Sequence, residues 1–436
     1  MKKYILIILC CLTSFPLWSY NVNMIVEHYS VDQGLPNNTV NCTLKDRDGF
    51  IWFGTWYGLC CFDGVKFKTF NKQEHDSDVP PRKIQRIVED KNGYIWVKTI
   101  DRKLYVFNKV TECFHAVYDD MKNYSENIQV IKLQNTAEGD VLLLTKDKNL
   151  LLAGVDEKGQ VTIKILFDSR NEINKHDYTL KHHVLCETEE YISWIGTDYK
   201  VAAVHKGSEL ASRPADFITS KINSGDKDSF TSFFEDGRKV WVGDRAGIFY
   251  SIDVRTGLVN RYVLSEIKGA ISNLLVTPAG YVYLSVAGQG TYEYDLAERR
   301  LQKINTEMND AMVTHAFIDQ YDKIWFHENE KALIYYDPLN HTAKRFPFTM
   351  FGKITTLYSE DAGERGLFFL SPAGEAWLFD REHAEMVYIN KLKQLSNDRT
   401  NQQFYHLMLD NDGVLWLSSA DEGVYCMNFQ IGRAHV

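Results

Sequence analysis

The chain repeats one pattern of hydrophobic and polar positions: a polar turn, an alternating strand rich in aromatic residues, and a second short apolar strand. The clearest copy is Asp48–Thr55 (DGFIWFGT), and a second runs from Asn92 to Thr99. Weaker copies lie at residues 139–145, 191–197, 236–243, 279–286, 322–327, 363–370 and 412–419. A spacing of about 40 to 50 residues is typical of four-stranded propeller blades. The pattern therefore predicts an all-β protein built from repeated blades.

Each unit is expected to hold four strands, a to d, which in the first unit cover residues 41–46, 50–55, 59–63 and 66–71. The Asp-Gly and Asn-Gly pairs before strand b favour a type I′ hairpin turn, in which both central residues have positive φ. Six tryptophans share one phase of strand b and are expected to pack between blades rather than to contact a ligand: Trp52, Trp96, Trp194, Trp241, Trp325 and Trp416.

The segment Ile25–Val31 resembles a strand d that precedes the first strand a. In a closed propeller such a strand completes the last blade and removes an open sheet edge. Because propellers have about four to eight blades, we predict seven blades, closed by pairing of Ile25–Val31 with Leu333–Asp337. The predicted domains are a first β-propeller at residues 21–341 and the start of a second, incomplete propeller at residues 342–430.

The two ends of the chain differ from the repeats. Lys2 and Lys3 precede the apolar stretch Tyr4–Trp18, which predicts a secretory signal peptide over residues 1–20 and hence export to the periplasm. An uncleaved anchor is left open as an alternative. Residues 431–436 resemble a translated sequencing adaptor and are expected to be a non-native tail on an incomplete chain.

Composition narrows the function classes. The net charge of -9 argues against a nucleic acid partner, which would need a cationic surface. The cysteines after the leader form no CxxC pair, and no histidines stand at zinc-finger spacing, so neither a metal site nor a catalytic cysteine is predicted. Buried free thiols are expected, and no cofactor is indicated.

The segments Tyr29–Asn38 and Asp48–Thr55, followed by Gly58-Leu59, resemble the two-component regulator propeller repeat. The arrangement is similar to the periplasmic sensors of hybrid two-component systems from Bacteroides-type gut bacteria. The resemblance covers nearly all of the chain after the leader. The units at Val141–Thr145 and Leu367–Leu370 lack the tryptophan.

The resemblance implies a larger receptor with two seven-bladed propellers, an immunoglobulin-like domain, one membrane helix, and cytoplasmic kinase, receiver and AraC-type DNA-binding parts. Such receptors detect breakdown products of complex glycans and switch on polysaccharide-utilisation genes. The expected partner is therefore an oligosaccharide, and a homodimer is expected for the complete receptor. Membrane contact and histidine kinase activity are expected only of parts that this chain lacks.

Strand order assigns the loops to two faces. The d-to-a and b-to-c loops share one face, here called the first face, while the a-to-b and c-to-d turns share the second face. Polar and aromatic residues suited to a sugar gather on the first face, because rings stack on sugar C–H surfaces and polar groups bind hydroxyls. The candidate ligand-binding residues are Asn38, Trp56, Tyr57, Arg82, Lys83, Asp101, Arg102, Tyr199 and Arg245.

Two rival functions remain open. A propeller glycosidase or lyase would need an acid/base carboxylate pair or a comparable constellation, and the sequence shows no such motif. A protein-interaction platform is favoured if the face that carries Trp56 and Tyr57 is flat rather than pocketed. The Asp46–Gly49 turn has a faint likeness to a calcium loop, but the ligand series of an EF-hand is missing.

Overall fold

The protein was analysed as a computed structural model. It describes residues 20–70, 80–122, 124, 129–169, 180–188, 190–196, 201–207, 230–304, 313–351, 358–361, 363, 366–371, 374–391 and 404–433. The predicted leader lies outside these residues, apart from its last position.

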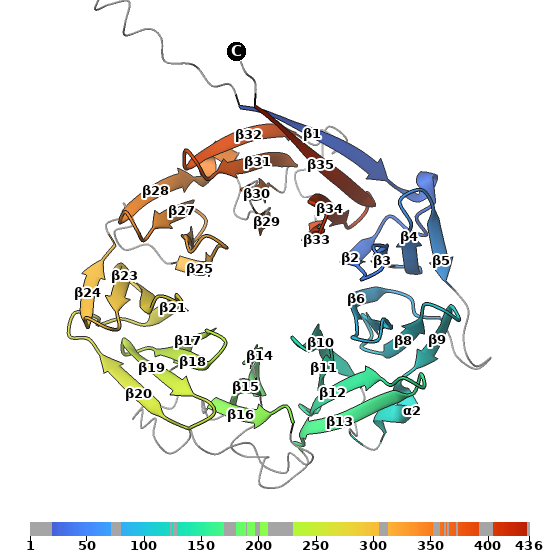
Figure 1. The fold of residues 1–436 in the computed structure, drawn as a ribbon, viewed down its shortest axis with the longest axis horizontal. Coiled ribbons are helices and arrows are strands. Elements are labelled where there is room, and N and C mark those ends of the chain that lie inside the picture. Colours follow the sequence, from blue (N-terminus) through green and yellow to red (C-terminus); the bar gives the residue numbers. More distant parts are fainter. Residues whose placement is uncertain are drawn as a thin grey trace, which may run out of the picture.

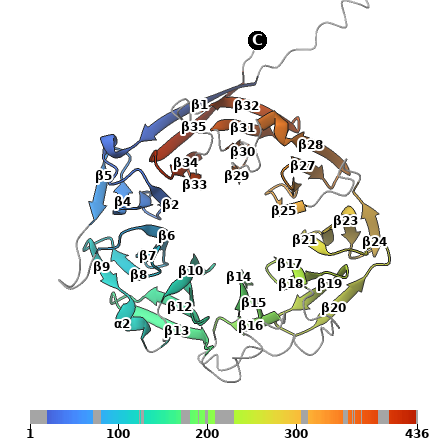
Figure 2. The same cartoon turned by 180° about the vertical axis from the view of Figure 1, so that it is seen from behind.

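The described strands form nine antiparallel sheets arranged as blades around one ring (Figures 1 and 2). Blades 1 to 5 consist of β2 (Val40–Lys45), β3 (Ile51–Thr55), β4 (Gly58–Phe62) and β5 (Phe67–Phe70); β6 (Ile84–Glu89), β7 (Ile95–Thr99), β8 (Leu104–Asn108) and β9 (Cys113–Ala116); β10 (Val130–Asn135), β11 (Val141–Thr145), β12 (Leu150–Val155) and β13 (Val161–Phe167); β14 (Leu180–Glu187), β15 (Tyr191–Gly196) and β16 (Val201–His205); and β17 (Phe230–Glu235), β18 (Lys239–Asp244), β19 (Ile248–Asp253) and β20 (Val259–Val263).

Blades 6 to 9 consist of β21 (Ile271–Val276), β22 (Tyr281–Val286), β23 (Gly290–Asp295) and β24 (Arg300–Lys303); β25 (Val313–Ile318), β26 (Ile324–Glu328), β27 (Ala332–Asp337) and β28 (Thr342–Pro347); β29 (Tyr358–Asp361), β30 (Leu367–Leu370), β31 (Glu375–Asp380) and β32 (Glu385–Lys391); and β33 (Phe404–Leu409), β34 (Val414–Ser419), β35 (Val424–Arg433) and β1 (Tyr20–Tyr29). Short helices complete the described part: η1 (Val31–Gln33), α2 (Tyr118–Met121) and η2 (Phe348–Phe351). The all-β propeller prediction is confirmed.

Ring closure differs from the prediction. β1 pairs with β35, and its Tyr29 lies opposite Val424. The predicted pairing of Ile25–Val31 with Leu333–Asp337 is wrong, because β28 follows β27 through a short turn and pairs with it first. The predicted domain boundary between residues 341 and 342 therefore falls inside blade 7. The described strands form one ring of nine blades, whereas the prediction was a closed ring of seven blades followed by two blades of a second propeller (Figure 1).

The turn before strand b is built around one aspartate. The Oδ1 atom of Asp46 accepts hydrogen bonds from the backbone N–H groups of Asp48 (3.0 Å) and Phe50 (2.9 Å). Gly49 has a φ of 92°, whereas Asp48 is not among the residues with positive φ. The predicted type I′ turn is therefore wrong, because the side-chain acceptor favours an Asx turn in which only the glycine needs positive φ.

The second carboxylate oxygen of the same aspartate binds the tryptophan of strand b. The Nε1 atom of Trp52 donates to Asp46 Oδ2 over 2.7 Å, so one side chain fixes both the turn and the indole. The six repeat tryptophans are at most 5% exposed, which confirms that they pack in the core.

Neighbouring blades approach closely at the glycine of strand b. A Cβ atom added to Gly54 would lie 2.4 Å from Cys42 Sγ and 2.6 Å from Ile84 Cγ2, which belongs to blade 2. Gly243 meets Ser232 and Ile271 in the same way in blades 5 and 6. Blades 1 and 5 therefore require a small residue at this position.

Among the described residues, no helix is long and apolar enough to cross a membrane.

Candidate functional site

Backbone hydrogen bonds join the loops of the first face from one blade to the next. Lys83 N–H donates to the carbonyl of Trp56 (2.9 Å), and Ile100 N–H donates to the carbonyl of Lys83 (2.9 Å). Gly423 N–H, in blade 9, donates to the carbonyl of Asn38 (2.8 Å). The d-to-a and b-to-c loops thus lie on one face, as predicted.

Aromatic side chains stand exposed on this face. Trp56 is 37% exposed and Tyr57 is 57% exposed, although both are large hydrophobic residues. The Nζ atom of Lys83 lies 5.1 Å from the centre of the Trp56 ring, a cation–π distance. Asn38 contributes differently, because its Oδ1 atom accepts the N–H of Val31 (2.8 Å) and so braces the loop.

A pocket of about 410 Å³ opens beside two of the predicted residues, Asp101 and Arg102. Its walls also include Tyr118 and Met121 from α2 and Gln129 from the loop that enters blade 3. This volume lies within the range of small-molecule sites. The first face is therefore hollowed rather than flat at blade 2.

The carboxylate of Asp101 is stabilised by neighbouring residues of its own loop. Burial opposes its ionisation, but a hydrogen bond from Thr99 Oγ1 (2.5 Å) and the nearby Lys103 ammonium (3.5 Å) lower the pKa of Asp101 below its ordinary value. Arg102 adopts a φ of 67° at the next position, and its side chain is exposed. The pocket therefore offers an ionised carboxylate and a guanidinium to a polar ligand.

Seven of the nine predicted residues lie on blades 1 and 2 or the loops that enter them: Asn38, Trp56, Tyr57, Arg82, Lys83, Asp101 and Arg102. Arg245 is exposed in the turn between β18 and β19, in blade 5, across the ring from them (Figure 1). Strand order placed it on the same face but could not place it in the same cluster. Tyr199 lies outside the described residues.

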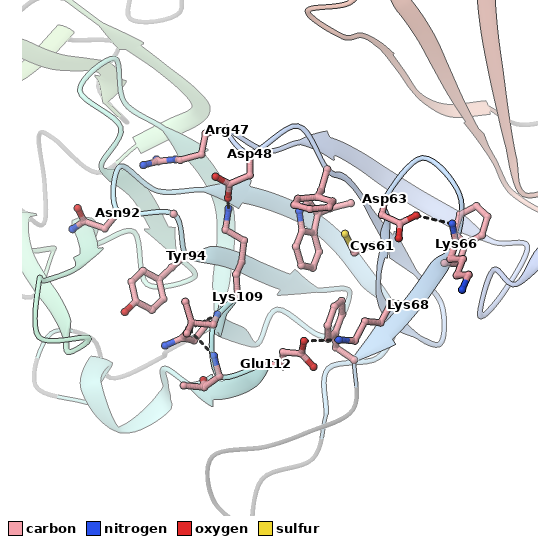
Figure 3. A pocket seen from close by; sticks show the side chains of 18 residues that line it. Arg47, Asp48, Cys61, Asp63, Lys66, Lys68, Asn92, Tyr94, Lys109 and Glu112 are labelled. Carbon is pink, nitrogen blue, oxygen red and sulfur yellow. Dashed lines mark hydrogen bonds and ion pairs between the residues drawn. The ribbon is translucent and has the colours of Figure 1, made fainter.

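Sequence reasoning missed a groove of about 1050 Å³ on the second face between blades 1 and 2 (Figure 3). Its walls come from the turns that precede strands b and d of both blades, with Phe50, Tyr94 and Glu112 among them. Phe50 is 41% exposed. No single turn signals the groove, because it forms only where two blades meet.

The charges of this groove are compensated by one another. Lys109 Nζ binds Asp48 (2.6 Å), Glu89 (2.8 Å) and Asp46 (3.1 Å), as Figure 3 shows for Asp48. Burial opposes the charge of Lys109, but these three carboxylates raise its pKa. Although Asp46, Asp48 and Glu89 lie close enough to share a cation, the lysine ammonium already occupies the space between them.

The five cysteines with described side chains are free thiols; the predicted burial holds for Cys42 and Cys60, whereas Cys61, Cys113 and Cys426 are partly exposed. Cys42 and Cys60 are buried, and burial raises the pKa of each thiol to about 12. Such thiols are unreactive at neutral pH.

Comparison with known proteins supports the resemblance seen in the sequence. Residues 34–57 match the family described as two component regulator propeller, a segment that contains Asn38, Trp56 and Tyr57. No curated protein sequence matches the chain.

Solved structures with a similar fold include extracellular domains assigned to the hybrid two component systems BT4673 and BT3049 of B. thetaiotaomicron. The BT4673 domain is 14% identical, with 92% of this chain and 65% of that one covered and a TM-score of 0.37. The BT3049 domain is 14% identical, with 92% and 58% covered and a TM-score of 0.36. The Dos1 propeller is 12% identical, with 93% and 95% covered and a TM-score of 0.48. This chain thus spans less than two thirds of the two extracellular domains.

Proposed function

We propose that this chain is the sensor region of a periplasmic hybrid two-component receptor and that it recognises a glycan-derived oligosaccharide on its first face. The observation that carries the proposal is the exposed pair Trp56 and Tyr57, inside the segment that matches the regulator propeller family, next to the pocket at Asp101 and Arg102. Exposed aromatic residues beside polar groups are typical of ligand sites on loops.

The chemistry of this face suits a sugar. The Trp56 and Tyr57 rings offer apolar surfaces for sugar C–H groups, while Asp101 accepts hydrogen bonds from hydroxyls and Arg102 donates them. A small pocket also favours an oligosaccharide over a flat protein partner. The groove on the second face is a weaker candidate, because most of its charged side chains, among them Lys68, Lys109 and Glu112, already form ion pairs with one another or with nearby carboxylates.

In the complete receptor, ligand binding would control polysaccharide-utilisation genes through kinase and DNA-binding parts outside this chain. We expect that receptor to be anchored in the inner membrane and to act as a homodimer. The sensor region itself binds and releases its ligand without breaking a bond.

Glycan-array binding with the purified chain tests this proposal. We expect weak but selective binding to one class of oligosaccharide, and recovery of the bound glycan unchanged on mass spectrometry. Cleaved or unsaturated products would instead establish the glycosidase or lyase alternative. Binding to no glycan on the array would contradict the proposed function.

The receptor context gives a second test. Replacing Trp56 or Arg82 by alanine in the intact receptor should reduce ligand-dependent gene induction without unfolding the blade, because loop changes are usually tolerated structurally. Normal induction in both variants would place the site elsewhere.

A further inference from the structure

Lys98, in blade 2, occupies a position of strand b that holds glycine or serine in five other blades. Strand b reads Trp-Phe-Gly-Thr in blade 1 and Trp-Val-Gly-Asp in blade 5, but Trp-Val-Lys-Thr in blade 2. The positions that correspond to Lys98 hold Gly54, Gly196, Gly243, Ser285 and Ser418 in five other blades, and Leu144, His327 and Leu370 in the remaining three. The propeller fold therefore does not require a lysine here.

This lysine is buried without a counter-charge. Lys98 is 5% exposed, and its Nζ atom donates to the side-chain amide oxygen of Gln85. Burial, together with the charge of Arg102, lowers the pKa of Lys98. β6 and β7 also place Arg86 directly opposite Lys98 in the sheet register. Like charges opposite each other destabilise a strand pair, so the fold alone gives no reason for this arrangement.

Three further cations lie on the first-face loops of the same blade. Arg82 and Lys83 stand on the loop that enters β6, and Arg102 stands on the loop after β7. The blade 2 cation cluster is defined here as Arg82, Lys83, Arg86, Lys98 and Arg102.

The cluster differs from the groove on the second face in one respect. Arg47, Lys68 and Lys109 of the groove all pair with carboxylates. In the part of the chain that the structure describes, no member of the blade 2 cation cluster forms an ion pair. Asp101, which stands on the same loop as Arg102, pairs with Lys103 instead. The chain has a net charge of -9, yet blade 2 carries these five cations without a carboxylate partner among the described residues.

We propose that the blade 2 cation cluster binds an anionic group, a carboxylate or a sulfate, of an acidic oligosaccharide. This inference rests on the proposed function and narrows its ligand class. An anion on this blade would supply the counter-charge that Lys98 lacks and would accept charge-assisted hydrogen bonds from Arg86 or Arg102. The neighbouring Trp56 and Tyr57 would then contact the sugar rings that carry the charge.

Inorganic sulfate tests the anion site without any glycan. Thermal unfolding of the purified chain is measured in sodium sulfate and in sodium chloride at equal ionic strength. For the wild type we expect a saturable increase in Tm of about 2 °C in sulfate relative to chloride. The double variant Lys98→Met, Arg102→Gln should lose this increase, whereas Lys66→Met, which removes an exposed lysine on the second face, should keep it. An equal increase in all three proteins would overturn the proposal, because it would reflect general exclusion of sulfate from protein surfaces.

A glycan array with uronate-bearing, sulfated and neutral oligosaccharides separates the two proposals. If acidic glycans bind and their affinity falls at least tenfold in the double variant, both the sensor function and the anion site are supported. Comparison of the uronate-bearing with the sulfated glycans then identifies the anion. Binding confined to neutral glycans would overturn the acidic ligand class and leave the sensor function standing. Loss of the sulfate effect in the double variant, with no glycan bound, would support the anion site and contradict the glycan sensor.

Discussion

The indole Nε1 atom of Trp96 donates a hydrogen bond of 2.9 Å to the buried carboxylate of Asp90. The same aspartate accepts the backbone N–H groups of Asn92 (2.9 Å) and Tyr94 (3.0 Å) at the turn. This pairing recurs in four other blades, at Asp46–Trp52, Asp236–Trp241, Asp319–Trp325 and Asp410–Trp416. It ties the polar turn of each of these blades to the aromatic core.

Replacing Asp90 by asparagine should destabilise the protein by about 1 to 3 kcal/mol. The amide can still accept both backbone N–H groups, but its NH₂ group would face the buried indole N–H, which then loses its acceptor. Urea unfolding checks the change. The control is Asp156→Asn, because Asp156 binds only the backbone N–H groups of Lys158 and Gln160 and should change stability little. Equal effects of the two substitutions would contradict the role given to the indole bond.

Lys98 and Lys109 should respond in opposite ways to replacement by methionine. Lys98→Met removes a buried charge that lacks a carboxylate, so we expect the free energy of unfolding to rise by about 1 to 2 kcal/mol. Lys109→Met leaves three carboxylates close together without their cation, so we expect a loss of about 3 kcal/mol. Chemical denaturation measures both.

The pH dependence of folding stability tests whether Lys98 is a buried cation without a counter-charge. Because the pKa of Lys98 is lowered in the folded protein, the unfolded chain binds more protons between that value and the unfolded value of about 10.4. Stability of the wild type relative to Lys98→Met should therefore rise with pH through this window. Two results would contradict a Lys98 without a counter-charge. One is equal stability of the wild type and Lys98→Met at pH 7, and the other is a wild-type stability that falls with pH relative to Lys98→Met.

Ring closure can be tested by a disulfide. Glu27 in β1 lies opposite Cys426 in β35, and burial together with the charge of Glu27 raises the pKa of that thiol. Glu27→Cys should therefore form an intramolecular disulfide with Cys426 on oxidation, detectable by peptide mapping, and raise stability by up to about 4 kcal/mol. Val26→Cys, whose side chain points to the other side of the strand, should not. Absence of the cross-link in Glu27→Cys would contradict the nine-blade ring.

Local features of the fold could be predicted from the sequence, whereas ring closure could not. Strand b and its tryptophan are visible because alternation and turn residues are local signals. The partner of Ile25–Val31 depends on which strand c lacks a strand d of its own. The last strand c, near Val424, lacks one, but the usual blade number of propellers favoured Leu333–Asp337 instead.

The candidate site was predictable in part for a similar reason. Strand order places Trp56, Lys83 and Arg102 on one face without any coordinates. It does not show that Arg245 lies across the ring. Lys98 was not among the predicted residues because a lysine in an alternating strand is usually exposed, and only the folded structure shows that it is buried.

The most direct test of the central claim, that the ligand binds on the first face, is the affinity of two alanine variants for the strongest glycan on the array. Isothermal titration with Trp56→Ala should show at least a tenfold weaker Kd than the wild type, which corresponds to about 1.4 kcal/mol. Phe50→Ala, an equally exposed aromatic residue in the groove of the second face, should bind like the wild type. Normal binding by Trp56→Ala together with lost binding by Phe50→Ala would contradict the account and place the ligand in the groove.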